Sequence, residues 1–315
     1  MFKKTLLKLS RSIVKLILPL VYKILIKLNL NRRVINFLTE KSYFSNNSYN
    51  FNKMIEEVLD SKKIIALDIG AQGGFNSDNF FSKKYEHFFK KILVEPINSE
   101  IKKLDGDQYT IDKGLWSKKE TKKLYLLGNR LGSSSMFKPD ESSFELHDIK
   151  KKDFQNFKIT NTEEIECDTI FNILTDINIE NLDYLKIDTQ GAEFEILKGL
   201  GKFRPLLIKV EAHIFSMYKG VPSWNKLLNL LYEFDYVLID WKEIGGHKTR
   251  VPAEIDLIFI PNFREENGKN LIINSKEKFI SLLLIFGQIE LLKIICKKLK
   301  INLKGLDKLQ DLYFN

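Results

Sequence analysis

A turn of small residues follows an apolar run near the start of the central region, and an acid precedes it. The run covers residues 64–69, with Asp68 near its end, and the turn is Gly-Ala-Gln-Gly-Gly at 70–74. Such a turn lets a backbone approach a ligand closely. A dinucleotide fingerprint would need glycines at 70, 72 and 75, and Gln72 and Phe75 break it. No Gly-Lys-Ser/Thr phosphate loop occurs in the chain.

The acid ahead of this turn indicates which ligand the turn would bind. Asp68 is unsuited to a pyrophosphate, but it suits a ligand with a cationic sulfonium or amine. Glu95 ends the next apolar run, where a carboxylate can accept both hydroxyls of an adenosine ribose. We therefore predict an S-adenosylmethionine site formed by Asp68, Gly70, Ala71, Gly73 and Glu95. The alternative is a tight strand-to-helix turn with a solvated acid.

Four side chains could take a proton from an acceptor hydroxyl: Asp188, Glu193, Glu211 and His213. A hydroxyl is a poor nucleophile, so methyl transfer to it benefits from a positioned base. We predict Asp188, Glu211 and His213 as catalytic residues. Structural alternatives stay open: Asp188 as a helix cap, Glu193 as a dipole partner in a first helical turn, and His213 as an ordinary structural histidine. No metal is predicted, because Asp188, Glu211 and His213 lack tight ligand spacing.

Seven apolar runs rich in β-branched residues must position these side chains. They alternate with helix-length segments, which predicts an α/β fold. Several runs end in a carboxylate, and ligands of open α/β sheets bind at the carboxyl ends of strands. Continuous apolar runs favour strands that are covered on both faces, hence a mostly parallel sheet. The runs are 63–69, 92–95, 109–113, 184–188, 206–211, 236–240 and 255–260.

Three further elements are expected around this sheet. A helix pattern begins near Ser77. The last two runs are joined by a short glycine-containing loop at 241–252, which predicts a hairpin and an antiparallel strand at the sheet edge. Residues 128–161 are polar and predict an excursion over the site, flanked by short strands at 122–127 and 164–169.

Four stretches resemble the FkbM-type methyltransferases of the class I S-adenosylmethionine-dependent superfamily. The most specific is LKIDTQGAEFEILKG at 185–199, led in by Asp168-Thr169-Ile170. The likeness covers about residues 60–262. This family often has an acid where Gln190 stands, so no catalytic role is assigned to Gln190. The other three stretches are LDIGAQG at 67–73, LVEP at 93–96 and GSSS at 132–135.

The resemblance implies a Rossmann-like sheet of seven strands, mostly parallel, with an antiparallel strand in the last-but-one position. It also implies methyl transfer to oxygen. We predict an S-adenosylmethionine-dependent O-methyltransferase that acts on a hydroxyl of a sugar, glycan or lipid-linked substrate. The alternative is a non-catalytic, membrane-associated α/β module that binds an adenosine ligand. The intact Asp68, Glu95 and Asp188 favour the enzyme.

The charge lies mainly at the ends of the chain. The net charge is +9; residues 1–33 carry nine bases and no acid, residues 263–315 sum to +4, and residues 34–262 sum to −4. A nucleic-acid enzyme would carry its positive field on the catalytic domain. The acidic central region and the absence of an Asn/Asp-Pro-Pro-Tyr/Trp motif therefore predict no nucleic-acid partner.

Residues 1–30 have the pattern of a basic amphipathic helix. Their longest uncharged run, 16–22, is too short to span a bilayer and contains Pro19. No cleavage site of a secretory signal peptide follows. The pattern favours an anionic membrane surface, and the alternatives are a helix docked on the catalytic domain and a mitochondrial presequence. We expect a cytoplasmic enzyme held on the cytoplasmic face of the membrane.

Three regions are predicted from these patterns: a basic helical extension at 1–45, the methyltransferase domain at 46–262, and a helical extension at 263–315. Within the last region, Asn274 and Glu277 resemble a capping box that would start a helix. Only two cysteines are present, Cys167 and Cys296. They cannot build a disulfide framework or a four-cysteine metal site, and they fit a reducing compartment.

Overall fold

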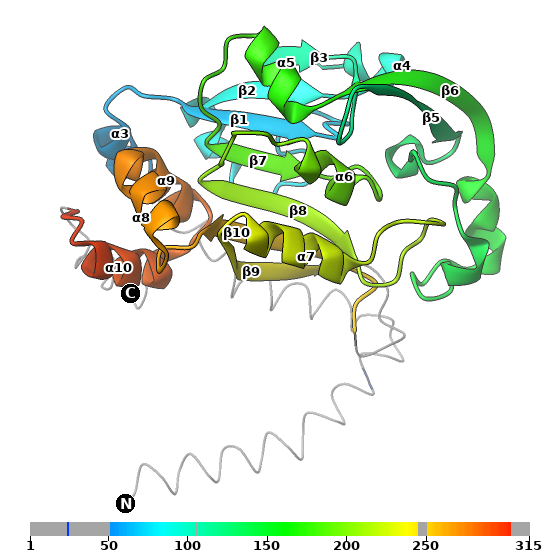
Figure 1. Cartoon of the computed structure of the whole chain (residues 1–315). Helices are drawn as coiled ribbons and strands as arrows, with labels where there is room; N and C mark the ends of the chain where they lie inside the picture. Colours follow the sequence, from blue (N-terminus) through cyan, green and yellow to red (C-terminus); the bar gives the residue numbers. More distant parts are fainter. Residues whose placement is uncertain (1–23, 25–50, 105, 107, 245–250, 304–315) are drawn as a thin grey trace, which may run out of the picture. The chain divides into compact units, whose positions relative to one another are not determined.

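The computed structural model describes Ile24 and residues 51–104, 106, 108–244 and 251–303 (Figure 1). Residues from Phe51 onward form one compact unit. The basic helix predicted at 1–30 lies outside the described residues, apart from Ile24. In the part of the chain that the structure describes, no helix is long and apolar enough to cross a membrane.

A seven-stranded sheet forms the centre of this unit, in the order β3-β2-β1-β7-β8-β10-β9. Neighbours from β3 to β8 run parallel, and β10 runs antiparallel to both β8 and β9. All seven predicted runs form strands, and the Rossmann-like fold class is confirmed. The strands are β1 (Ile64–Ile69), β2 (Phe89–Val94), β3 (Gln108–Ile111), β7 (Tyr184–Ile187), β8 (Leu207–His213), β9 (Tyr236–Ile244) and β10 (Glu254–Pro261).

The loop at 241–252 predicted an antiparallel strand at the edge of the sheet. The antiparallel strand, β10, lies instead in the last-but-one position, as the resemblance implied. Every residue of β10 after Glu254 is buried, whereas β9 alternates between buried or half-buried and exposed positions. A strand that is apolar on both faces must be covered on both sides. The half-polar β9, with Asp240 and Lys242, is therefore the better edge strand.

A second, smaller sheet carries the excursion over the carboxyl ends of the parallel strands. Its order is β4-β6-β5, with β4 (Gly114–Leu115), β5 (Glu120–Leu127) and β6 (Ile159–Asp168). Between β5 and β6 lie three short 3-10 turns: η3 (Leu131–Ser133), η4 (Glu141–Ser143) and η5 (Lys151–Phe157). The excursion has its own apolar cluster, formed by Leu127, Phe144, Phe157, Met217 and Tyr218.

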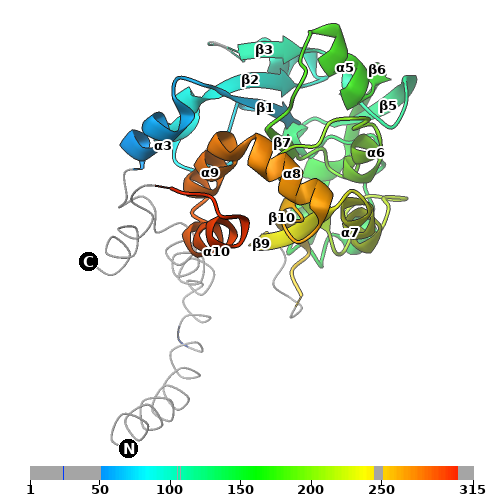
Figure 2. The same ribbon diagram turned by 60° about the vertical axis from the view of Figure 1, so that its left-hand side comes forward.

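Helices occupy two places around the sheet. Figures 1 and 2 show α5 (Ile170–Asp176), α6 (Glu193–Lys198) and α7 (Trp224–Glu233) together on one side of it. A second group gathers beyond the beginning of the parallel strands, away from their carboxyl ends (Figure 1). It contains α3 (Asn52–Leu59), α8 (Glu266–Asn274), α9 (Lys276–Ile285) and α10 (Ile289–Leu299), and a short α4 (Asn98–Ile101) follows β2.

Two expectations about helix starts are wrong. Asn274 ends α8 and does not begin the next helix, and α9 starts after Ser275 with no side-chain cap. No helix starts near Ser77; turns lead instead to η2 (Lys83–Phe88). The reason is local, since the Asn76 side chain hydrogen-bonds both the N–H and the carbonyl of Phe81 and closes a turn. Asn76 itself has a positive φ of 54°.

Two lysines are buried on one face of the central strands. Lys186 on β7 lies 3.0 Å from the Asp68 carboxylate on β1. Lys209 on β8 lies 2.7 Å from Asp78 and 2.8 Å from Asp256. Burial lowers the pKa of each lysine, but the carboxylates outweigh it and hold both pKa values above the usual range. These ion pairs fix the segment after β1 onto the sheet.

The Lys209 cluster generates the first prediction. Lys209→Met should lower the free energy of unfolding by about 3 to 5 kcal/mol, because it leaves the buried carboxylates of Asp78 and Asp256 without a partner. Urea denaturation measures this loss. Lys198→Met is the matched control, since its ion pair with Glu195 lies at the surface and should be worth less than about 1 kcal/mol. Equal losses in the two variants would contradict a structural role for Lys209.

Candidate active site

A pocket lies at the carboxyl ends of β1, β2 and β7, with an empty volume of about 590 Å³ that includes its open mouth. Strand ends, the second sheet and the excursion all contribute to its walls, so elements far apart in the sequence meet there. We call it the donor pocket. Its lining residues are Ile69, Gly70, Gln72, Val94, Glu95, Pro96, Ile97, Lys113, Gly114, Leu115, Leu124, Leu131, Gly132, Ser134, Met136, Asp188, Thr189, Gln190 and Ile196.

The structure separates the five residues predicted to bind the cofactor into two groups. Gly70 and Glu95 line the donor pocket, whereas Asp68, Ala71 and Gly73 are not among its lining residues. Asp68 is fully buried and pairs with Lys186 beneath the glycine turn. Its geometry is that of a group that supports the turn from below.

Gly70 is required by the packing of the two strand ends. Its φ is +78°, and a Cβ atom there would lie 1.8 Å from the carbonyl oxygen of Asp188. Its N–H donates to the Val94 carbonyl at 3.0 Å. The ends of β1, β2 and β7 therefore meet at this residue, and Glu95 and Asp188 reach the same pocket.

Glu95 is a buried carboxylate at the wall of the pocket. One of its oxygens accepts a hydrogen bond from the Ile97 N–H at 2.9 Å. Burial raises the pKa of Glu95 to about 7, against the lowering effect of that N–H, and the nearby Glu100 raises it further. A ligand that donates hydroxyls here would stabilise the ionised form.

Gln190 connects the donor pocket to the end of β8, although no catalytic role was predicted for it. Its amide nitrogen donates to Asp188 at 3.2 Å and to Glu211 at 2.9 Å. Its amide oxygen accepts from the Tyr218 hydroxyl at 2.9 Å, and its carbonyl accepts from Ser135 at 2.7 Å. These bonds hold Gln190 at a positive φ of 59°.

Asp188 and Glu193 have different surroundings in the structure. Asp188 does not cap a helix, because α6 begins only at Glu193, after Ala192. The Glu193 carboxylate accepts hydrogen bonds from the backbone N–H groups of Thr189 and Gly191. Glu193 stands in the first turn of α6, where its structural alternative placed it, and it also braces the loop before that helix, while Asp188 faces the donor pocket.

A second, smaller hollow lies beside the end of β8, with an empty volume of about 240 Å³ that includes its open mouth. We call it the acceptor hollow. It contains Glu211 and His213, and the Gln190 amide spans the distance from Asp188 to Glu211. The three predicted catalytic residues are therefore linked across two neighbouring cavities. The hollow is lined by Gly191, Glu193, Phe194, Glu211, Ala212, His213, Val221, Pro222, Trp224 and Leu227.

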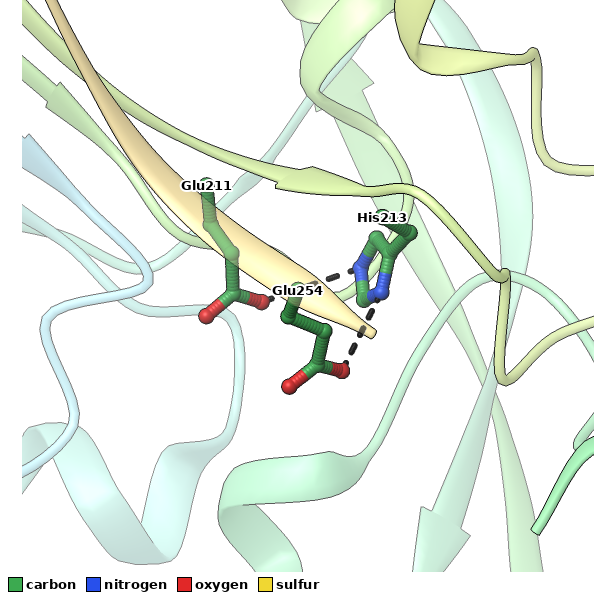
Figure 3. Close-up of side chains that lie close together, drawn as sticks. All are labelled: Glu211, His213 and Glu254. Atoms are coloured by element: carbon green, nitrogen blue, oxygen red, sulfur yellow. Dashed lines mark ion pairs between the residues drawn. The ribbon is translucent and has the colours of Figure 1, made fainter. Parts of the chain in front are cut away.

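Glu254 joins this group, and the sequence reasoning missed it. It is the first residue of β10 and lies opposite His213 in the antiparallel register. His213 Nδ1 lies 3.2 Å from Glu254 Oε1, and His213 Nε2 lies 3.7 Å from Glu211 Oε1 (Figure 3). Burial lowers the pKa of His213, but Glu254 and the other carboxylates outweigh it, so the net shift is upward.

The comparison with known families decides what this arrangement belongs to. The FkbM methyltransferase domain matches residues 68–238, more than half of the chain. The chain belongs to the FkbM methyltransferase family. It is an S-adenosylmethionine-dependent methyltransferase, and the non-catalytic adenosine-binding module is set aside. No curated protein matches the chain significantly.

Several solved structures are similar to this methyltransferase at low identity. One is a putative DNA modification methyltransferase encoded within a prophage of E. coli, with 11% identity, a TM-score of 0.33, and coverage of 63% of this chain and 47% of that chain. Another is titled a pericyclic reaction enzyme, with 9% identity, a TM-score of 0.34, and coverage of 66% and 46%. The chain spans just under half the length of these two proteins.

A third is the plantazolicin methyltransferase BpumL, solved in complex with a monoazolic desmethylPZN analog and SAH. It shows 10% identity and a TM-score of 0.32, and the alignment covers 74% of this chain and 90% of that chain.

The chemistry of the donor pocket fits the family's cofactor. Glu95 offers a carboxylate for ribose hydroxyls, and apolar side chains such as Val94, Ile97 and Leu124 offer a wall for a flat base. Gly132 lies opposite the Gln72 side chain, whose oxygen would lie 2.3 Å from an added Cβ. Gly132 and Gln72, from the excursion and the glycine turn, thus approach each other closely at the wall of the pocket.

The pKa of Glu95 generates the second prediction. A raised pKa in the folded state means that Glu95 stabilises the ligand-free fold fully below its unfolded pKa of 4.5, and that this stability is lost as the pH rises towards about 7. Glu95→Gln should remove that loss. Relative to wild type, the variant should gain up to about 3 kcal/mol between about pH 4.5 and about pH 8.

Urea denaturation at several pH values measures this gain. Glu57→Gln, at an exposed position on α3, is the matched control and should follow the wild-type profile. Parallel profiles for wild type and Glu95→Gln would show that Glu95 titrates normally. In wild type alone, donor binding should tighten over the same rise in pH, because ribose hydroxyls donate to the ionised carboxylate.

Proposed function

We propose that this methyltransferase transfers the methyl group of S-adenosylmethionine to a hydroxyl of a sugar, glycan or lipid-linked acceptor. One observation carries the proposal: Asp188 in the donor pocket and Glu211 in the acceptor hollow are joined through the Gln190 amide. A donor and an acceptor that occupy these two cavities would meet at Asp188. Such alignment alone supplies several kcal/mol of the barrier reduction.

The donor pocket would hold the cofactor through Gly70 and Glu95, with Asp68 beneath the turn in a supporting role. Glu95 would accept the ribose hydroxyls, and Gly70 and Gln72 would present backbone to the amino-acid part of the ligand. The bound cofactor supplies an electrophilic methyl group on a sulfonium. Asp188 lies in the same pocket and places a negative charge where a sulfonium is favourable.

The acceptor hollow supplies the features expected for a sugar or lipid-linked hydroxyl. Phe194 and Trp224 give it aromatic walls, and Glu211 and His213 give it polar groups. An aromatic face packs well against the apolar side of a sugar ring, while the polar groups orient its hydroxyls. This mixture favours a neutral polar molecule over a nucleic-acid strand, because no lysine or arginine is among the described residues that line the hollow.

Asp188 is the best candidate for the general base. Burial and the surrounding carboxylates raise the pKa of Glu211 well above its usual value, so Glu211 is a poor proton acceptor in its neutral form. The upward shift of the His213 pKa likewise favours its protonated form. Glu211 and His213 then orient the acceptor, and Asp188 takes its proton.

The third prediction tests this function. Purified protein with a methyl-labelled donor should methylate glycans or lipids extracted from cells, as read by mass spectrometry, and the product should be a methyl ether. Asp188→Asn keeps the shape of the side chain and should lower turnover by about 10² or more. The donor-dependent rise in Tm should persist, about 2.7 kcal/mol of stabilisation at 100 times Kd.

Asp176→Asn, at an exposed position at the end of α5, is the matched control and should keep full turnover. Normal turnover by a folded Asp188→Asn protein would move the base to Glu211 or His213. A labelled nitrogen or carbon in the product would overturn transfer to oxygen.

We further propose that residues 1–33 attach the enzyme to an anionic membrane surface on the cytoplasmic side. Nine basic residues and no acid occupy this segment. Apolar burial in the interface and about 1 kcal/mol for each nearby basic residue would act together. An acceptor that carries a lipid would then be met at the membrane.

The fourth prediction concerns this attachment. The full chain should sediment with anionic vesicles at low salt and be partly released at high salt, because salt screens the charges. Replacing Lys4, Lys8, Arg11 and Lys15 by Gln should reduce the bound fraction at least tenfold, given about 1 kcal/mol per residue. A chain that begins at Asn46 should stay in solution and still bind the donor. Equal sedimentation of all three proteins would disprove the role of residues 1–33.

A further inference from the structure

We propose that Glu211, His213 and Glu254 bind a divalent metal ion, of the class of Mn²⁺ or Zn²⁺, beside the acceptor hollow. Each residue offers one ligand atom, and these atoms all lie within 4.8 Å of one another. Atoms that bind a common ion at about 2.1 Å lie about 3 to 4 Å apart. Two carboxylates with one imidazole suit Mn²⁺ and Zn²⁺ better than Ca²⁺.

Two neighbouring strands bring these side chains together. Glu211 and His213 are two residues apart on β8 and so point to the same face of the sheet. Glu254 pairs with His213 across the antiparallel ladder. Figure 3 shows the three side chains converging from β8 and β10. All three residues thus stand on two neighbouring strands of the seven-stranded sheet.

The buried His213 imidazole lacks a hydrogen-bond partner among the described residues. Its side chain is 2% exposed, and among the described residues neither ring nitrogen has a partner in hydrogen-bond geometry. Glu254 lies 3.2 Å from Nδ1 but outside hydrogen-bond geometry, and Glu211 lies 3.7 Å from Nε2, too far for a hydrogen bond. A buried imidazole with unsatisfied nitrogens is costly. A metal ion would satisfy one of these nitrogens.

The negative charge around Glu211 also favours a bound cation. Four further carboxylates lie around Glu211, those of Asp188, Glu193, Glu254 and Asp256. Buried carboxylates in such a group must either bind protons or share a cation. Among the described residues, Lys209, His147 and Arg130 are the basic side chains near this group, and Arg130 is exposed and lies over the Phe157 ring.

Lys209 already serves Asp78 and Asp256. His147 lies 3.5 Å from Glu254 through Nδ1, while its Nε2 is engaged with the Phe215 carbonyl at 2.8 Å. A divalent ion would supply the positive charge that these side chains do not.

The role of the ion rests on the proposed function, although its binding does not. Three protein ligands leave coordination positions open, and Glu211 and His213 line the acceptor hollow. An acceptor hydroxyl bound there would lose its proton more readily. Asp188 would take that proton, the hydroxyl oxygen would bond the methyl carbon, and the carbon–sulfur bond would break with its electron pair left on sulfur.

The fifth prediction tests ion binding on the full chain. The protein is stripped with a chelator and titrated with MnCl₂ while the free ion is followed by electron paramagnetic resonance; equilibrium dialysis with ZnCl₂ is the second measurement. We expect one ion per chain and a rise in Tm with either metal. Glu254→Gln and His213→Gln should each weaken binding tenfold or more. His87→Gln, which removes a histidine of η2, should leave it unchanged.

Two outcomes would overturn the site. One is wild-type protein that binds neither Mn²⁺ nor Zn²⁺ while its Tm still rises with S-adenosylmethionine; there, a proton shared by His213 and Glu254 takes the place of the ion. The other is binding that survives both Glu254→Gln and His213→Gln, which would mean an adventitious ion elsewhere. The donor-dependent rise in Tm, measured in the same samples, reports on the donor pocket alone and keeps a failure of the proposed function distinct.

Discussion

The ends of β1 and β7 meet with no room for a side chain between them. Gly70 has a positive φ and packs against the carbonyl of Asp188. This contact sets the distance between the side chains at the ends of the two strands. Because the turn after β1 is drawn against β7, Glu95 from β2 and Asp188 from β7 open into one cavity. A single missing Cβ atom thus lets Glu95 and Asp188, the proposed ribose-binding and catalytic carboxylates, line one pocket.

The two faces of the sheet are held by different forces. One face is packed with aliphatic side chains under α5, α6 and α7. The other carries the buried pairs Lys186–Asp68 and Lys209–Asp256, with the aromatic rings of Phe75 and Phe81 packed against Tyr184. Charged rows of this kind are expensive to bury. They run towards the end of β8, where the proposed catalytic residues lie and the described carboxylates are no longer matched by lysines.

The sequence predicted well what depends on local pattern and poorly what depends on pairing between distant segments. All seven strands were predicted because their apolar runs are continuous and bounded. Asp188, Glu211 and His213 were predicted as catalytic residues because they end such runs or closely follow one, and the structure places them at two neighbouring cavities. Glu254 was missed because only the antiparallel register of β10 brings it to His213. The helix expected near Ser77 failed because the Asn76 side chain replaces a backbone turn, which a periodicity argument does not see. The ion pair between Asp68 and Lys186 was not predicted, because the two residues lie 118 positions apart in the sequence.

The walls of the two cavities come from largely different parts of the chain. Val221, Pro222 and Trp224 close the acceptor hollow and are not among the residues of the donor pocket, whereas Gly70 and Glu95 belong to the donor pocket alone. Selection can therefore act on one wall without the other. On the proposed function, substitutions in the segment before α7 would reshape the acceptor site and leave Gly70 and Glu95 of the donor pocket unchanged. A lineage with this architecture can diversify its products at little cost to its shared reagent.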